Sequence, residues 1–174
     1  REEAKRLKAE PQYSGLKEIK KFSGALAAFE RFLMKPGKIG IILGARGSGK
    51  SALGLRMLEN IEAKSGKEEY SSYALGFNSK KLPDWMNAVN SIEQVPNDSF
   101  LIVDESGIQF SSRSSMSNAN KLLSELLLIS RHKNISIIFI TQNSANIEIN
   151  TLRQADYLLF KRSSLLQLDF ERKK

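Results

Sequence analysis

Residues 44–51 read GARGSGKS and match the pattern G-x-x-x-x-G-K-[ST]. Glycines at these spacings allow positive φ angles, so the backbone N–H groups can turn inward and approach an anion closely. Such a turn before a helix favours binding of nucleotide phosphates at the helix N-terminus. Lys50 is placed to contact the β- and γ-phosphates, and the Ser51 hydroxyl to ligate Mg²⁺. The residues expected to bind the phosphates of ATP are Gly44, Ala45, Arg46, Gly47, Ser48, Gly49, Lys50, Ser51 and Ala52.

An apolar strand predicted over residues 100–103 ends in two acidic residues, Asp104 and Glu105. In a parallel sheet the carboxyl ends of the strands face the ligand crevice. We therefore expect Asp104 to hold Mg²⁺ through its water shell, and Glu105 to polarise a water for attack on the γ-phosphate. The alternative is that the two acids cap a loop. A small-molecule kinase is a distant alternative, because its acceptor is not water and the sequence has no Arg-rich lid segment.

A third segment joins Arg131 and His132, an apolar strand over residues 135–140, and the dipeptide Thr141-Gln142. With the two motifs above, it resembles the FtsK/HerA superfamily of DNA-pumping ATPases, and most closely the short viral genome-packaging ATPases. The resemblance covers roughly residues 37–162. Many members carry large added domains that this sequence lacks. We expect the chain to be a fragment, or another protein to supply those parts.

The resemblance implies a RecA-like core in which the Thr-Gln strand lies between the strand before residue 44 and the strand that ends at Asp104. Gln142 would then contact the γ-phosphate and sense its loss, since an amide both donates and accepts hydrogen bonds. A solvent-facing amide is the alternative. Arg131 and Arg153 are the candidates for an arginine finger acting across a subunit boundary, and a structural ion pair is the alternative for each. His132 either orients Arg131 or is a neighbour without a catalytic role.

Residues 106–120 are rich in Ser and Asn and follow the two acids directly. Their composition is typical of a loop. In the ring translocases that this chain resembles, such loops line the pore. The candidate contacts to nucleic-acid phosphates, made without reading base sequence, are Arg113, Ser112 and Ser114. A surface loop without a ligand is the alternative.

Apolar strands alternate with helices along the chain, a pattern typical of a parallel sheet buried on both faces. The turn at residues 44–51 follows a strand and precedes an amphipathic helix, which favours a phosphate site over a chance glycine-rich turn. We predict an α/β, RecA-like three-layer P-loop NTPase with a mostly parallel central sheet flanked by helices. An N-terminal helical segment, residues 1–36, is expected to be part of the core or packed on it, and residues 37–174 to form the ATPase domain. The predicted strands are 39–43, 70–77, 100–103, 135–140, 155–160 and an edge strand at 165–170; the predicted helices are 1–10, 23–35, 51–63, 82–89 and 121–132.

The chain has 174 residues, a net charge of +8, one His and no Cys. These counts exclude a disulfide scaffold, thiolate metal sites and a multi-His zinc site. The basic surplus lies at the two ends, with net +5 in residues 1–40, net zero in 41–160 and net +3 in 161–174. Solvated terminal helices are one interpretation, and patches that bind a polyanion are the other. No apolar run exceeds five residues, so neither a membrane span nor a membrane contact is predicted.

We therefore expect an enzyme that hydrolyses ATP with Mg²⁺ and translocates or packages double-stranded DNA. Binding is expected to be independent of base sequence, because no base-reading helix is evident. The expected assembly is a homo-oligomer, a hexameric ring, because a trans-acting arginine needs a neighbouring subunit. We expect it in the cytoplasm, that of the host or associated with a virion if the source is viral, with an unidentified recruiting partner. An ATPase for virion assembly or protein secretion at a membrane is one alternative. A nucleotide-binding switch with weak hydrolysis is another, although Glu105 argues against it.

Overall fold

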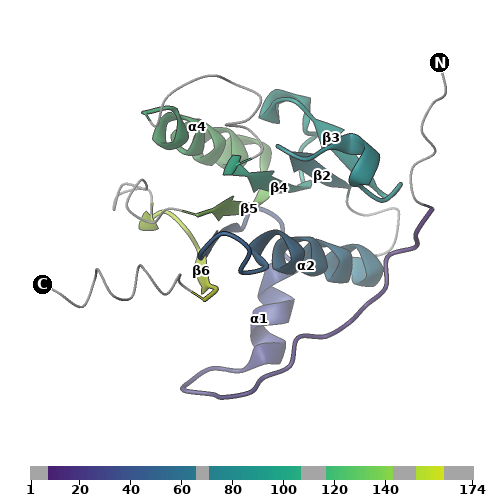
Figure 1. Ribbon diagram of the computed structural model, residues 1–174, viewed down its shortest axis with the longest axis vertical. Coiled ribbons are helices and arrows are strands. Elements are labelled where there is room, and N and C mark those ends of the chain that lie inside the picture. The colour runs from purple at the N-terminus through teal and green to yellow at the C-terminus, as the bar shows by residue number, and fades with distance from the viewer. Residues whose placement is uncertain (1–7, 66–70, 107–116, 143–151, 163–174) are drawn as a thin grey trace, which may run out of the picture.

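The computed structural model describes residues 8–65, 71–106, 117–142 and 152–162, and within them the chain forms a six-stranded, all-parallel sheet (Figure 1). The strand order is β3-β2-β4-β5-β1-β6. The strands are β1 (Ile39–Leu43), β2 (Ser72–Leu75), β3 (Met86–Val89), β4 (Phe100–Asp104), β5 (Ser136–Thr141) and β6 (Tyr157–Phe160). The helices are α1 (Leu26–Leu33), α2 (Lys50–Ser65) and α4 (Ser117–Lys133), with short 3₁₀ helices η1 (Ser79–Lys81) and η2 (Ile92–Gln94).

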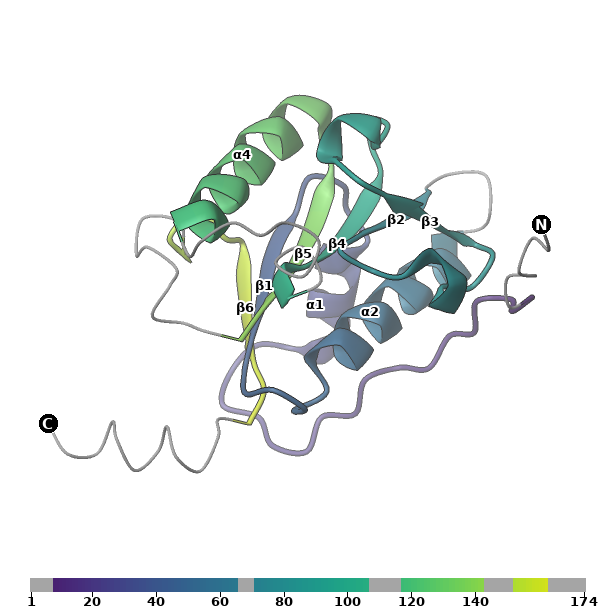
Figure 2. The same cartoon turned by 45° about the horizontal axis from the view of Figure 1, so that its top comes forward.

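Helices cover both faces of the sheet: α4 lies over one face, and α1 and α2 lie over the other (Figures 1 and 2). Every residue of β1 and β5 is buried, as expected for central strands of a parallel sheet. Successive residues of β1 face opposite layers, so Ile41 packs in the core under α4 and Ile42 packs in the core under α2. The predicted three-layer α/β fold is therefore confirmed.

Strand β5 lies between β1 and β4, as the resemblance implied. Leu43 of β1 pairs with Thr141 of β5, and Asp104 of β4 pairs with Ile140 of β5. Because the three strands are parallel and in this register, they end at the same edge of the sheet. The residues that follow them are brought together there.

Helix α1 is anchored to the sheet through Tyr157 of β6. The rings of Phe29 and Phe32 meet the Tyr157 ring edge-on, with centroids 5.5 and 6.3 Å away. A Cβ atom at Gly40 of β1 would lie 1.9 Å from the Tyr157 ring, so only glycine leaves room for this ring. Burial raises the pKa of the Tyr157 hydroxyl well above its usual range. The helix predicted over residues 23–35 is therefore present as α1, and two of its aromatic residues pack on β6.

Three details of the predicted secondary structure are wrong. Residues 8–10 are not helical, and residues 12–14 lie beside α2, where Ser14 N–H donates to Asn60 Oδ1 at 2.8 Å. The helix predicted over residues 82–89 is instead a turn followed by β3, which pairs with β2. The predicted loop at residues 106–120 is too long, because α4 begins at Ser117. The expected edge strand at 165–170 lies outside the described residues.

In the described part of the chain, no helix is long and apolar enough to cross a membrane.

Candidate functional site

The predicted phosphate-binding turn connects the end of β1 to the start of α2. Gly47 and Gly49 have φ angles of 74° and 82°, a backbone region that favours glycine. Ser48 N–H donates to Ala45 O at 3.2 Å, which closes the turn before α2 begins at Lys50. The strand, turn and helix N-terminus required of an anion site are therefore all present.

Lys50 is a buried cation, with 6% of its surface exposed. Its Nζ donates to Gly44 O at 2.8 Å and to Ala45 O at 2.7 Å. Burial lowers the pKa of the Lys50 ammonium, and the negative charge of Asp104 partly opposes that shift. The two salt bridges found among the described residues, Arg56–Glu59 and Lys64–Glu30, do not involve Lys50. A buried ammonium held by carbonyl oxygens is stabilised further by an anion, and a phosphate supplies one.

Ser48 adds a second sign that this turn accepts a ligand. Its Oγ is the one buried side-chain polar atom without a hydrogen-bond partner in the described part of the chain. Leaving a buried hydroxyl unpaired costs free energy, and such groups in native proteins usually have a partner. A phosphate oxygen in the turn would satisfy this hydroxyl.

The Ser51 hydroxyl donates to Asp104 Oδ2 at 3.0 Å, which joins α2 to the end of β4. The other carboxylate oxygen, Asp104 Oδ1, accepts hydrogen bonds from Ser106 N–H at 3.0 Å and from Ser106 Oγ at 2.5 Å. Hydroxyl and carboxylate oxygens are the ligands that Mg²⁺ prefers. No cluster of three or more His, Cys, Asp or Glu suited to a metal occurs among the described residues. This pair therefore fits a Mg²⁺ ion that takes its other ligands from water and phosphate.

Glu105 and Gln142 lie at the same sheet edge, because they follow β4 and β5 directly. Glu105 is buried, with 6% of its surface exposed, and Gln142 is exposed. The role of Glu105 as a base stays a prediction, and so does the contact of the exposed Gln142 amide with a phosphate.

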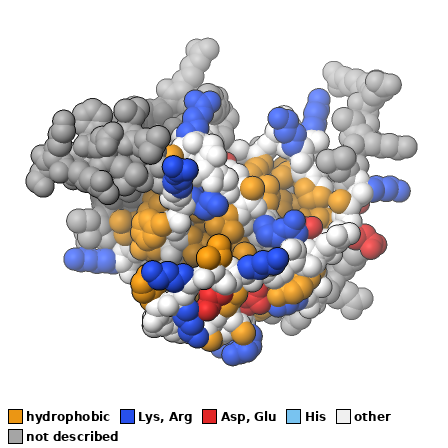
Figure 3. All heavy atoms as spheres, turned by 60° about the horizontal axis from the view of Figure 1, so that its bottom comes forward, with side chains coloured by type: hydrophobic (Ala, Val, Ile, Leu, Met, Phe, Trp, Pro, Cys, Tyr) orange, Lys and Arg blue, Asp and Glu red, His pale blue; other side chains and the backbone are white. Residues whose placement is uncertain are grey.

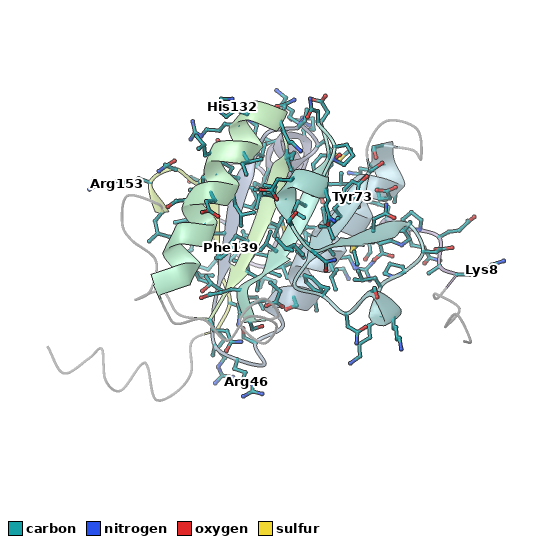
Figure 4. The ribbon with its side chains drawn as sticks, turned by 90° about the horizontal axis from the view of Figure 1, so that it is seen from above. Lys8, Arg46, Tyr73, His132, Phe139 and Arg153 are labelled. Carbon is teal, nitrogen blue, oxygen red and sulfur yellow. The ribbon has the colours of Figure 1, made fainter. Side chains whose placement is uncertain are left out.

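The two candidate arginine fingers lie elsewhere. Arg131 is exposed near the end of α4, and Arg153 is exposed in the turn before β6, so both precede strands and lie at the amino edge of the sheet. Figure 4 shows His132, the neighbour of Arg131, at the opposite end of the molecule from Arg46 of the turn. Neither arginine is therefore placed to reach the turn of its own chain. Three further predicted residues, Ser112, Arg113 and Ser114, lie outside the described residues.

Two residues at this edge were not predicted from the sequence. Ser106 holds Asp104 through two hydrogen bonds, and an Asp followed two residues later by Ser is a pattern that could have indicated this turn. Lys161 directly follows β6, the neighbour of β1. A basic residue after a strand of a parallel sheet was the available signal for it.

A family model described as "Zonular occludens toxin (Zot)" matches residues 50–157. This is more than half of the chain, so the chain belongs to the Zot family.

Among solved structures, the chain is similar to PCH-2 of C. elegans, with 14% identity and a TM-score of 0.46 over 78% of this chain and 40% of that one. It therefore spans less than half the length of PCH-2. It is also similar to B204, the DNA-packaging ATPase from Sulfolobus Turreted Icosahedral Virus, with 23% identity and a TM-score of 0.46 over 80% of this chain and 82% of that one. A third likeness is to the FIGL-1 AAA domain in complex with ADP, with 13% identity and a TM-score of 0.39 over 73% and 44% of the two chains. Comparison with curated proteins gave no significant match.

Proposed function

We propose that this chain, as a member of the Zot family, binds ATP with Mg²⁺ at residues 44–52 and hydrolyses it. One observation carries the proposal: the buried Lys50 ammonium and the Ser51–Asp104 hydrogen bond lie at the same edge of the sheet. A cation for phosphate and an oxygen pair for Mg²⁺ are the two parts that a P-loop nucleotide site requires.

Each residue of the site has a distinct task in this proposal. The N–H groups of residues 47–52 and the Lys50 ammonium bind the phosphates, and Ser51 and Asp104 hold the Mg²⁺, which neutralises phosphate charge when bound. Glu105 accepts a proton from the attacking water. Gln142 contacts the γ-phosphate and the water from the end of β5. Arg131 and Arg153 lie at the other edge of the sheet, so either one acts on the phosphates of a neighbouring subunit.

The first experiment compares nucleotide binding by the wild type, Lys50→Ala and Lys35→Ala. Lys50→Ala is expected to weaken binding of a fluorescent ATP analogue by at least about tenfold, because a hydrogen bond from a charged group contributes about 1.5–3 kcal/mol. Lys35 is an exposed lysine next to the start of β1, far along that strand from the turn, and its variant is the matched control. Equal affinity in all three proteins would exclude residues 44–52 as the phosphate site.

Hydrolysis is tested separately with Glu105→Gln. This change preserves the shape of the side chain and removes its basicity, so ATP should still bind while the turnover rate falls by about 10²–10⁴-fold. A variant that keeps more than about a tenth of the wild-type rate would show that Glu105 is not the base.

We also infer that hydrolysis is coupled to movement of DNA in a homo-oligomeric ring, in the manner of the FtsK/HerA superfamily. The motif from Arg131 to Gln142 and the basic surplus of the terminal segments support this inference. Figure 3 shows Lys and Arg side chains among hydrophobic ones on one side of the molecule. In the N-terminal segment, Lys17, Lys20 and Lys21 are exposed. Lysine contacts to DNA phosphates would not read base sequence.

DNA coupling is tested by ATP turnover with and without duplex DNA, and by the salt dependence of DNA binding. Duplex should raise turnover, and six phosphate contacts should cost roughly 10³ in affinity between about 50 and 200 mM salt. A DNA affinity that does not change with salt, or an ATP turnover that does not change with DNA, would contradict the proposed coupling of hydrolysis to DNA movement.

The trans-acting arginine is tested by mixing subunits. Arg131→Ala should lower turnover without weakening ATP binding. A mixture of Arg131→Ala with Lys50→Ala should regain activity if the intact Arg131 of one subunit serves the intact turn of its neighbour. No recovery at any ratio, for this arginine and for Arg153→Ala, would exclude action across an interface.

An ATPase for assembly or secretion at a membrane is the second candidate, and a specific observation favours it. Ile19 and Phe22 are 99% and 90% exposed, and the Lys20 ammonium lies 5.0 Å from the centre of the Phe22 ring. Exposed apolar side chains among lysines are typical of a surface that binds anionic lipid. Sedimentation with vesicles of phosphatidylglycerol, in the absence of stimulation by DNA, would select this candidate.

A further inference from the structure

The end of β6 remains attached to the phosphate-binding turn beyond the last strand residue. Leu43 pairs with Phe160 in the parallel ladder, and Lys161 N–H donates to Leu43 O at 2.7 Å. Ala45 N–H then donates to Arg162 O at 3.2 Å. Residues 161–162 are therefore fixed against Leu43 and Ala45, on either side of Gly44.

The side chain of Lys161 lies along the turn. A Cβ atom at Gly44 would lie 2.7 Å from Lys161 Cβ, so the base of the lysine side chain packs directly on the first glycine. A Cβ atom at Gly49 would lie 3.8 Å from Lys161 Cε and 3.9 Å from Lys161 Nζ. The ammonium group therefore lies beside the last glycine, next to Lys50, where α2 begins.

The charge of Lys161 is not neutralised within the described part of the chain. Neither of the salt bridges there includes this residue, although its side chain is partly buried. The Lys50 ammonium follows Gly49 in sequence and is likewise without a carboxylate partner in a salt bridge. An anion in the turn would give both ammonium groups a counter-charge.

We propose that Lys161 is a second cation of the phosphate site, which binds the nucleotide polyphosphate from the side of β6. The proposal rests on the proposed function, because it needs a nucleotide in residues 44–52. Gly49 lies where a P-loop backbone cradles the α- and β-phosphates, whereas the lysine of the motif reaches the β- and γ-phosphates. Lys161 therefore contacts phosphates that ADP and ATP share, and it contributes to affinity more than to the hydrolytic step.

The experiment measures the affinity of Mg-ADP and of a non-hydrolysable ATP analogue for four proteins: the wild type, Lys161→Met, Lys161→Arg and Arg162→Met. Methionine keeps the unbranched stem that packs on Gly44 and removes the charge, whereas arginine keeps the charge. Arg162 is the matched control, because it is the adjacent cation, is exposed, and bonds to the turn only through its carbonyl oxygen.

Lys161→Met should weaken the binding of both nucleotides by the same factor, about tenfold, and should lower kcat much less. Lys161→Arg should stay within a few-fold of the wild type, and Arg162→Met should match the wild type. If Lys161→Met binds both nucleotides as the wild type does, or if the Met and Arg variants lose affinity equally, the proposal is overturned while the nucleotide site stands. If the wild type and Arg162→Met bind neither nucleotide, the proposed function itself fails and the role of Lys161 fails with it.

Discussion

Replacing Gly54 with alanine tests how closely α2 must approach the sheet to place Lys50 and Ser51. A Cβ atom at this position would lie 2.8 Å from Ile102 Cδ1 and 3.2 Å from Ile140 Cδ1, both closer than ordinary van der Waals contact. The added methyl group should gain about 1 kcal/mol of helix propensity and lose about 1–3 kcal/mol through overpacking. We therefore expect Gly54→Ala to lower the free energy of unfolding by about 0–2 kcal/mol.

A double-mutant cycle isolates the steric part of this effect. Ile102 is fully buried, and Ile102→Val removes the Cδ1 atom that the new methyl group meets. In the wild type, Ile102→Val should lower the free energy of unfolding by about 0.5–1.5 kcal/mol. In the Gly54→Ala background the loss should be much smaller, because the new methyl group occupies the vacated space. The two changes should thus couple favourably by about 1 kcal/mol, measured by urea denaturation with a common m value.

The control for the cycle is Ile41→Val, a fully buried change on the opposite face of the sheet, under α4. Its effect on the free energy of unfolding should add to that of Gly54→Ala within about 0.5 kcal/mol. If Ile102→Val is equally additive, α2 does not pack against Ile102 as described, and the close approach of the helix is wrong.

Three further predictions concern single residues. Burial raises the pKa of the Glu62 carboxyl, so the folded chain binds this proton more tightly than the unfolded chain does, and wild-type stability should fall as the pH rises above about 4.5. At pH 8, Glu62→Gln should therefore unfold at a higher urea concentration than the wild type. At pH 4 this gain in stability should vanish. Gly40→Ala drives a Cβ atom into the rigid Tyr157 ring and should destabilise by about 3 kcal/mol or more in the same urea assay. Ser106→Ala removes a hydrogen bond to Asp104 and should raise the Mg²⁺ concentration needed for nucleotide binding by roughly tenfold or more in a Mg²⁺ titration.

Each of these has an outcome that contradicts it. A stability gain of Glu62→Gln that persists at pH 4 would reflect packing and not the titration of a buried carboxyl. A Gly40→Ala variant as stable as the wild type would mean that the Tyr157 ring does not lie over β1. A Mg²⁺ requirement unchanged in Ser106→Ala would show that Asp104 needs no support from this hydroxyl.

The strand, turn and helix of the proposed phosphate site could be predicted because everything that forms them is local. The apolar run of β1, the glycines of the turn and the first residues of α2 are contiguous, so spacing alone indicates how they fold. The acids that end β4 could be predicted for the same reason. That β4 and β1 both flank β5 is a long-range fact, and it was available only through the family resemblance.

The strand β3 could not be predicted because its local pattern points the other way. Leu82 and Met86 are both buried and lie four residues apart, with Pro83 between them, a pattern that is also typical of a helix start. What decides the outcome is parallel pairing of residues 86–89 with β2, which no short window of sequence contains. Lys161 was missed for a related reason, since its importance depends on β6 being the neighbour of β1.

The two edges of the sheet separate the proposed site into parts that one chain cannot combine. The turn, Asp104 and Glu105 lie at the carboxyl edge, whereas Arg131 precedes β5 at the amino edge. The six residues of β5 span about 20 Å, far beyond the reach of an arginine side chain. If an arginine from this motif completes the phosphate site, the amino edge of one subunit must therefore face the carboxyl edge of the next. Such a head-to-tail contact is heterologous, and repeating it closes into a ring whenever the rotation between subunits divides a full turn. The position of Arg131 within a single chain thus makes the proposed trans catalysis and the proposed ring one hypothesis, which the mixing of subunits tests as a whole.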